Sequence, residues 1–476
     1  MGLVQTIKFS DFNNDELFRM DAKFHFLNKR FGWNIFDTKN RNLISLKDIL
    51  VPNCKIFKYE NDEEYKGIPT GRDHLNEFGD IISYQVVTKD EHPNRLKYKV
   101  NSNCILISSL KGAKTPALSF DFDLSNYVFS NGFYVFEVSK QWNKKFMLYL
   151  LRTKTIKHIL DNHIYRGIGI SSYKENDLLK VQIQNINLQI QNKVIEKIKP
   201  IEKEIETLKT EKEDTLEIIS DVFLKEFNIN FEEVEKLDNT KQFNLKLKHT
   251  ILKNDLLRAS FKWHKLEIIQ SYMYKDIKCI EKLSKFIIST KNGWSPQSSE
   301  VEEGTPILGQ EHILKNGQIS LSASKFTILT RNNIENFYIK KNDFFVSRGN
   351  TVELVALAGL VTDDIEDDIL YPDLYIKIDF DEKYIDKQYM AYLFNSFFGR
   401  IYFKHVAKGK NQTMVKVSSK ELYDFHVPLP NKTIQQEIIN KIKTQIDLQK
   451  DIDKQIKNKQ DEISKIIEDS IKCDAE

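Results

Sequence analysis

The C-terminal half of the sequence contains one segment with the residue types of a metal-dependent nuclease. Pro372-Asp373 is followed by Asp381-Glu382-Lys383. Paired carboxylates can hold Mg²⁺, and a nearby lysine can help to activate water for attack on a phosphodiester. The spacing is shorter than this pattern normally has, and the N-terminal half offers no counterpart. A nuclease that uses Asp373, Asp381 and Lys383 is therefore kept only as an alternative hypothesis.

Other catalytic patterns are missing from the sequence. It contains no Asn-Pro-Pro-Tyr-like segment of an adenine methyltransferase, no glycine-rich cofactor loop and no P-loop. Cys54, Cys104, Cys279 and Cys473 stand alone, without a Cys-x-x-Cys motif or a histidine cluster, which argues against zinc and against a disulfide framework. We expect no catalytic residue, no metal ion and no cofactor in this chain.

The same features predict the compartment. Isolated cysteines fit a reducing cytoplasm. No apolar run approaches the length of a membrane span, and the N-terminus lacks the apolar core of a signal peptide. The sequence therefore predicts a cytoplasmic protein that does not enter a membrane.

Any surface that binds nucleic acid must be local, because the formal net charge is only +3 over 476 residues. Phosphate contacts need cations, and contacts to base edges need amide or guanidinium groups. Several loops supply both kinds of group. The candidate DNA-binding residues are Arg72, His74, Lys111, Lys114, Arg166, Arg348, Asn350, Lys404, Lys408, Lys410, Asn411 and Gln412.

Residues 405–412 form the strongest of these candidate loops. Gly409 can act as a hinge between Lys408 and Lys410, so the loop can follow a phosphate backbone while Asn411 or Gln412 contacts a base. The alternative is a solvated basic loop without a ligand, which is the commoner role of such a segment.

The elements that must position these loops are organised around two long helices. Apolar residues recur at steps of three and four in 187–222 and again in 431–466, which indicates helices that bury a narrow stripe against each other. Lys212 and Thr215 interrupt the first seam, and Pro200 predicts a kink or a new helix start. The residues expected to hold the helix pair and to dock partner proteins are Ile198, Ile201, Ile205, Leu208, Ile442, Ile452, Ile456 and Ile463.

The two helices are copies of each other. Asn187 matches Asn431 and Gln191 matches Gln435, both at a spacing of 244 residues. A period this long indicates that a whole domain was duplicated together with its helix. We predict a domain at 1–186, a long helix at 187–227, an extended connector at 228–249, a second domain at 250–430 and a second long helix at 431–472, with the helices packed antiparallel.

Inside the domains the sequence predicts short strands and turns followed by helices. The second domain repeats the order of the first, since Gly79 is answered by Gly317 and Ile107-Ser108 by Val346-Ser347. The segments predicted in the first domain are a helical turn at 46–49, strands at 81–87, 104–107, 133–136 and 181–183, and a helix at 146–159.

Three passages of the second half resemble the DNA-sequence specificity (S) subunits of type I restriction-modification systems. Asn292-Gly293-Trp294-Ser295-Pro296 resembles the opening motif of that family, and 340–349 resembles its Lys-x-Gly-Asp strand, with Asn342 in place of the usual glycine. Val427-Pro428-Leu429-Pro430, followed by Gln435-Gln436, resembles its Pro-Leu-Pro start of a conserved helix. In the first half, Ile183-Gln184-Asn185-Ile186 lacks both prolines. The resemblance covers almost the whole chain.

The resemblance implies an α/β (α+β) fold with two pseudo-symmetric globular target-recognition domains separated by a long antiparallel two-helix coiled coil. Each domain would bind one part of a two-part sequence in double-stranded DNA. Two methyltransferase subunits would dock on the helix pair, and restriction subunits would be able to join. S-adenosylmethionine, and ATP with Mg²⁺ for restriction, would belong to those partners, and this chain would have no catalytic site.

A coiled-coil interaction protein that does not bind DNA is a further alternative. Salt distinguishes the two hypotheses, because a complex with phosphates weakens steeply as ionic strength rises, whereas apolar helix docking does not.

Overall fold

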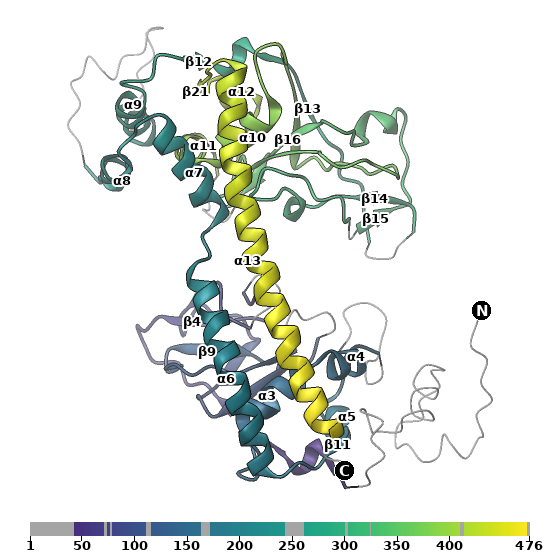
Figure 1. The fold of residues 1–476 in the computed structure, drawn as a ribbon. Coiled ribbons are helices and arrows are strands. Elements are labelled where there is room, and N and C mark those ends of the chain that lie inside the picture. The colour runs from purple at the N-terminus through teal and green to yellow at the C-terminus, as the bar shows by residue number, and fades with distance from the viewer. Residues whose placement is uncertain are drawn as a thin grey trace. The chain divides into compact units, whose positions relative to one another are not determined.

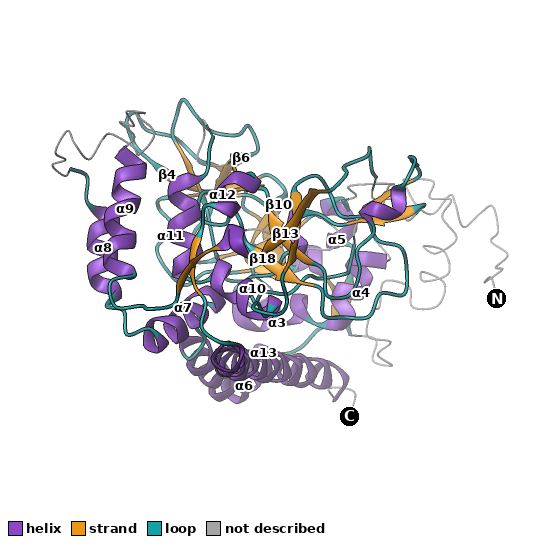
Figure 2. Cartoon of the chain, turned by 90° about the horizontal axis from the view of Figure 1, so that it is seen from above, coloured by secondary structure: helices purple, strands orange, loops and turns teal. Residues whose placement is uncertain are grey.

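A computed structural model gives the fold, and it describes residues 42–70, 74–76, 79–110, 116–162, 172–242, 261–299, 303–323, 325–409 and 414–473. The chain divides into two compact units, in which both halves of the sequence take part. Unit 1 is Met1–Lys209 with Lys454–Glu476, and unit 2 is Thr210–Asp453. Both units combine strands and helices (Figure 2). Among the described residues, no helix has the length and apolar character needed to cross a membrane.

The first half of the chain begins with strands and ends with helices (Figure 1). Its elements are β1 (Leu43–Ser45), η1 (Leu46–Asp48), β2 (Leu50–Pro52), β3 (Lys55–Ile56), β4 (Tyr65–Ile68), β5 (Gln85–Val87), β6 (Leu96–Lys99), β7 (Cys104–Ser108), β8 (Ala117–Leu118), β9 (Tyr127–Ser130), β10 (Phe133–Val138), α3 (Lys144–Arg152), α4 (Lys154–Asn162), α5 (Glu175–Leu179), β11 (Gln182–Gln184) and α6 (Leu188–Thr210).

Among the described residues, the second half begins with three helices, and from β12 onward it again runs from strands to helices and ends in a long helix. Its elements are α7 (Thr215–Glu226), α8 (Phe231–Asn239), α9 (Phe261–Met273), β12 (Ile280–Lys282), η3 (Leu283–Lys285), β13 (Ile287–Asn292), β14 (Thr305–Ile307), η4 (Gln310–His312), β15 (Lys325–Thr327), η5 (Ile334–Phe337), β16 (Phe344–Ser347), β17 (Gly349–Asn350), β18 (Ala358–Leu360), β19 (Tyr375–Phe380), α10 (Lys387–Asn395), α11 (Phe397–Val406), β20 (Val415–Lys416), α12 (Ser419–Tyr423), β21 (His426–Pro428) and α13 (Lys432–Cys473).

The two domains share a four-stranded sheet of the same topology, although unit 1 also has a five-stranded sheet of order β3-β6-β9-β4-β5 where unit 2 has the two-stranded sheets β14-β15 and β17-β20. Unit 1 has a four-stranded antiparallel sheet of order β2-β10-β7-β8, and unit 2 has one of order β13-β19-β16-β18. In each unit the first strand pairs with the last strand before the long helix, as β1 with β11 and β12 with β21. The parallel pair β4–β9 is matched by a parallel bridge from Ile307 to Leu370. The predicted duplication and the mixed helix-and-strand fold are confirmed.

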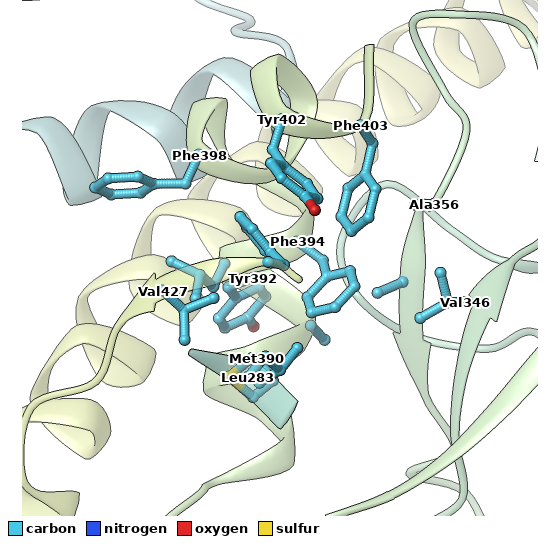
Figure 3. Packing of buried hydrophobic residues seen from close by; sticks show 14 of the residues in the cluster. Leu283, Val346, Ala356, Met390, Tyr392, Phe394, Phe398, Tyr402, Phe403 and Val427 are labelled. Atoms are coloured by element: carbon cyan, nitrogen blue, oxygen red, sulfur yellow. The ribbon is translucent and has the colours of Figure 1, made fainter. Parts of the chain in front are cut away.

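Helices α10 and α11 cover one face of the unit 2 sheet and form its core (Figure 3). Asp386 is the N-cap of α10, and its side chain accepts hydrogen bonds from the Gln388 and Tyr389 amides. Ser396 is the N-cap of α11, and its side chain accepts a hydrogen bond from the Phe398 amide. Phe394 is fully buried and packs against Phe403, with 5.3 Å between the ring centroids. Burying a side chain of this size contributes about 1.5–3 kcal/mol.

One buried glutamine joins each domain to its long helix. In unit 2 the Gln435 side chain accepts a hydrogen bond from the Asp386 amide (2.8 Å) and donates to the Pro430 carbonyl (2.8 Å). In unit 1 the Gln191 side chain accepts from the Asn143 amide (2.7 Å) and donates to the Ile186 carbonyl (2.8 Å). Both glutamines are 0% exposed. The same pair of hydrogen bonds therefore recurs in both units.

The long helices pair within each unit. In unit 1, Lys459 of α13 forms an ion pair with Glu204 of α6, and the two helices lie side by side in Figures 1 and 2. In unit 2, α7 pairs with α13 through Glu226 and Lys441, which are 2.7 Å apart. Lys212, just before α7, forms an ion pair with Asp453 at 2.6 Å. The residue number on the α7 side falls from 226 to 212 as that on α13 rises from 441 to 453, so the two helices run antiparallel.

The first long helix differs from its prediction. It is two helices, α6 and α7, separated at residues 211–214, because the polar run that interrupts the seam ends one helix and Asp214 caps the next. Pro200 lies inside α6, so no new helix begins there. The second helix is continuous, as predicted.

Most of the predicted seam residues are buried inside their own units. Ile198, Ile201, Ile205, Ile442, Ile456 and Ile463 are buried, whereas Leu208 and Ile452 are half-buried. Ile446 and Ile467 join them in the interior of the pair. The six buried side chains therefore stabilise the interior of the unit to which each belongs. Partner docking by the seam stays a prediction.

Three segments differ from the sequence-based expectation. The connector contains helix α8, whose Val234 is buried in the unit 2 core, so it is not extended. The helix predicted at 146–159 is broken at Thr153 into α3 and α4. The strand predicted at 81–87 is limited to β5, because residues 81–84 form only an isolated bridge from Ile81 to Leu75.

Replacing the buried glutamine of unit 2 tests this contact. Gln435→Ala leaves the Asp386 amide and two carbonyls without their partner, so the free energy of unfolding should fall by about 2–3 kcal/mol in urea titration. The neighbouring Gln436→Ala is the matched control, because Gln436 is exposed and bonds only to Asn440 among the described residues. Equal urea midpoints for the two variants would contradict the expectation.

Candidate nucleic-acid interface

Three of the candidate residues of unit 2, Arg348, Asn350 and Lys408, lie at one end of its four-stranded sheet. Strands β13 and β16 end there and β19 begins there, since the Gly293 amide donates to Tyr375 (3.2 Å) and the Arg348 amide donates to Leu374 (2.7 Å). Three loops therefore meet beyond this end of the sheet. Their backbones are fixed by the strands, as a binding surface made of loops requires.

A short ladder brings Arg348 and Asn350 next to the basic loop predicted at 405–412. Strand β17 pairs with β20, so that Gly349 faces Lys416. Lys408 forms a bridge to Lys416. The Val417 amide donates to the Arg348 carbonyl (2.8 Å). The predicted residues Lys410, Asn411 and Gln412 lie outside the described residues, in the segment between Lys408 and β20.

Lys416 joins this cluster although the sequence analysis did not select it. It lies on β20 opposite Gly349, and its side chain is exposed. Nothing in the local sequence distinguishes it from other surface lysines. Only the β17–β20 pairing places it beside Arg348.

The charges of the cluster are unequally neutralised. Lys408 forms an ion pair with Glu421 at 2.6 Å. Burial tends to raise the pKa of Glu421, but hydrogen bonds from Lys408 and Ser418 outweigh it and lower the pKa. The Arg348 guanidinium has no hydrogen-bond or ion-pair partner within the described part of the chain. Among the described residues, Arg348 and Lys416 are therefore the cations of this cluster that are left for an external anion.

A half-buried arginine supports the loop that follows Asn350. The Arg400 guanidinium donates to the carbonyls of Glu353 (3.1 Å) and Val355 (2.8 Å). Burial lowers the pKa of Arg400 to about 9, so it stays charged at neutral pH. These two hydrogen bonds fix the loop that follows Asn350 against α11.

Lys404 has a different environment from the other candidates. Its Nζ lies 2.7 Å from Asp238 Oδ2 on α8, and His405 Nε2 donates to Asp238 Oδ1 at 2.7 Å. The hydrogen bond from His405, together with Lys404, holds the pKa of Asp238 well below its usual value against the effect of burial. Lys404 therefore joins α11 to α8, and whether it also contacts DNA stays a prediction.

Unit 1 repeats the loop arrangement. The Tyr173 amide donates to the Ser109 carbonyl (3.2 Å), and Leu110 forms a bridge to Ser172. Lys111 thus follows Leu110 as Asn350 follows Gly349. Of the residues predicted in this unit, only His74 is described, and its Nδ1 lies 2.9 Å from Ser83 Oγ. Arg72, Lys111, Lys114 and Arg166 lie outside the described residues.

The structure separates the residues of the nuclease alternative. Asp373 precedes β19 and Asp381 follows it, so the six-residue strand keeps their carboxylates roughly 20 Å apart. Asp373 Oδ1 accepts a hydrogen bond from Ser295 (2.6 Å), which fixes it in a turn. Among the described residues, no group of three or more His, Cys, Asp or Glu could hold a metal ion. These carboxylates cannot share one Mg²⁺, and the alternative is wrong.

No protein-family model and no curated protein sequence matches this chain. Similar solved structures come from type I restriction-modification systems. One is a chain from a structure of the complex assembly and conformational transition of such a system (11% identity, 91% of this chain and 97% of that chain, TM-score 0.38). Another is the HsdS subunit from Thermoanaerobacter tengcongensis (12%, 91% and 96%, 0.33). A third is the S subunit from M. genitalium (13%, 91% and 98%, 0.32).

At these identities and TM-scores, the function of this chain has to be argued from its own residues and contacts. The repeated sheet, the repeated glutamine contact and the loops at equivalent sheet ends are the observations that bear on it.

The Asp238 cluster gives a pH-dependent expectation. Because its pKa is depressed in the folded state, ionised Asp238 stabilises unit 2 above the unfolded value near pH 4, and this contribution is lost as pH falls below about 4. Asp238→Asn should lower the free energy of unfolding by about 1–3 kcal/mol at pH 7, with a smaller difference below about pH 4. Urea titration at a series of pH values measures both.

Glu235→Gln on the same helix is the control, because Glu235 is exposed and has no ion pair among the described residues. A difference between wild type and Asp238→Asn that grows on acidification would exclude this assignment.

Proposed function

We propose that this chain is the DNA-sequence specificity subunit of a type I restriction-modification system. Its two domains would each bind one part of a two-part target in double-stranded DNA. The observation that carries the proposal is the duplicated domain, with candidate DNA-binding loops that leave the equivalent end of the same four-stranded sheet in each unit. Two modules with one framework and different loops suit two different half-targets.

The length of α13 is compatible with a two-part target. Helix α13 is a single helix of 42 residues, which corresponds to a length of about 60 Å at 1.5 Å per residue. Its first part belongs to unit 2 and its last part to unit 1. Half-sites contacted from one face of DNA are separated by about 34–36 Å for each helical turn, so a rod of this length suits a two-part target.

The catalytic steps belong to partners under this proposal. Two methyltransferase subunits would bind S-adenosylmethionine, and restriction subunits, where present, would use ATP with Mg²⁺. The protein would act in the cytoplasm, on host DNA. This chain would supply recognition alone, which fits the separation of Asp373 from Asp381. The exposed Leu448 and the half-buried Leu208 and Ile452 remain available on the helices for docking.

Modified-base mapping tests the proposal directly. Host DNA should carry adenine methylation at one two-part motif when this chain is expressed with its methyltransferase partner, and should lose it when the gene is deleted. A helix-interaction protein without DNA binding would leave the methylation pattern unchanged although the partner is expressed. That result would contradict the proposal.

Arg348 should contribute one phosphate contact. The affinity of the full chain with its methyltransferase partner for duplex DNA should fall steeply between about 50 and 200 mM salt, and Arg348→Ala should reduce the slope of log K against log salt by about one. Fluorescence anisotropy measures the slope. Lys341→Ala is the matched control, since Lys341 lies before β16 and pairs with Asp364 (2.7 Å). If the two variants give the same slope, Arg348 does not contact a phosphate.

A further inference from the structure

A planar polar side chain rests on aromatic rings in unit 2. The Arg331 guanidinium carbon lies 4.7 Å from the centroid of the Phe337 ring and 5.4 Å from that of the Trp294 ring. Arg331 is exposed and has no hydrogen-bond or ion-pair partner among the described residues. Its N–H groups therefore have no partner within the described part of the chain, while the two rings hold the guanidinium in place by cation–π contacts.

The rings that support Arg331 are themselves fixed. The Trp294 amide donates to the Tyr371 carbonyl (3.1 Å). A side chain at Gly293 would place Cβ 2.1 Å from the Pro372 carbonyl oxygen, so only glycine lets the backbone approach this closely. Lys291 Nζ donates to the Asn336 carbonyl (3.1 Å) and lies 4.8 Å from the Phe337 ring centroid. The guanidinium is thus held on a rigid base.

Unit 1 contains the same device with a different side chain. The His92 ring stacks on the Tyr59 ring, with 4.2 Å between the centroids and 24° between the planes. His92 Nδ1 lies 3.1 Å from the Thr88 carbonyl oxygen, which can only accept, so Nδ1 carries the proton. The Tyr59 hydroxyl donates to the Leu96 carbonyl (3.1 Å), which fixes the supporting ring. In the neutral imidazole, Nε2 is left as an acceptor.

The two stacks occupy equivalent places in the duplicated fold. His92 lies in the connection after β5, and Arg331 lies in the connection after β15; each of these strands pairs antiparallel with β4 or β14, respectively. Trp294 follows β13, and Tyr59 follows β3, the strand that comes directly after β2; β2 and β13 are the equivalent edge strands of the two four-stranded sheets. The support is aromatic in both units, and only the polar group differs.

We propose that Arg331 and His92 are specificity-determining residues that each contact a base edge in one half-target. This rests on the proposed function. The Arg331 fork matches the O6 and N7 acceptors of guanine in the major groove. His92 Nε2 can accept a hydrogen bond from the exocyclic amino group of cytosine or adenine. Two different polar groups, each on an aromatic support of its own, would give the two units different base preferences.

The surroundings favour a base over a phosphate as the ligand of Arg331. Ile328 and Leu329 precede it in the same loop and are 71% and 46% exposed. Ile56 is 65% exposed and lies close in sequence to Tyr59 in unit 1. Apolar groups of this kind suit thymine methyl groups and base edges, and the nearby Lys291 ammonium already donates to the Asn336 carbonyl.

Sequence selection on randomised duplexes tests the inference. The full chain with its methyltransferase partner is incubated with duplex libraries in which one half-target at a time is randomised, and bound duplexes are sequenced. Arg331→Ala should lower the preference at one base pair of one half-target by about tenfold or more, and His92→Ala should do so only in the other half-target. Arg331→Lys should also lose the preference, because lysine keeps the charge but not the two-pronged geometry.

Three outcomes are informative besides the expected one. If Arg331→Ala weakens binding to all sequences equally and Arg331→Lys restores it, Arg331 contacts a phosphate and the inference is wrong. If both alanine variants select the wild-type motif with wild-type preference, neither residue contacts a base. If the wild-type complex selects no two-part motif, the proposed function itself fails. Lys341→Ala, at the other end of the unit 2 sheet, should keep the wild-type motif.

Discussion

A buried amide at the start of each long helix is the contact on which the rest of each unit depends. Gln191 and Gln435 are excluded from water, so each of their polar atoms must find a protein partner. Each glutamine accepts a hydrogen bond from the amide of the N-cap residue of a domain helix and donates one to the carbonyl two residues before its own long helix. The domain sheet, the domain helices and the long helix are thereby joined in one rigid body within each unit. The loops at the end of the sheet are therefore anchored to a fixed framework.

The framework keeps its contacts while its residues change. Arg152 in unit 1 and Asn395 in unit 2 both donate to the carbonyl of the strand beside them, at Ala117 (2.8 Å) and Ala358 (2.9 Å). Ile186 replaces Pro430 because the glutamine needs only the backbone carbonyl at that position. Contacts made through the backbone tolerate substitution, and this explains why the first half of the sequence resembles the family motifs less than the second.

The parts of the fold that depend on periodicity could be predicted, and the parts that depend on tertiary pairing could not. The 244-residue repeat predicted matching domains, and it paired Gln191 with Gln435 without showing their common role. Asn342, which stands where the resembled family has glycine, has a left-handed φ of 68°, a conformation that asparagine tolerates better than most residues. The position of Lys416 follows from a strand pair, and that of Lys404 beside Asp238 from helix packing. Neither leaves a local signal in the sequence.

The interrupted seam of the helix pair shows how two local irregularities can have one cause. Polar Gln449 lies on the apolar stripe of α13, and the opposite helix breaks at 211–214. The Gln449 side chain accepts a hydrogen bond from the Glu213 amide (3.0 Å), which the helix break leaves without a helical partner. Lys212 pairs with Asp453 one turn further along α13. An apolar residue at position 449 would remove this hydrogen bond and leave the exposed amide to water, so the polar position in one helix matches the break in the other.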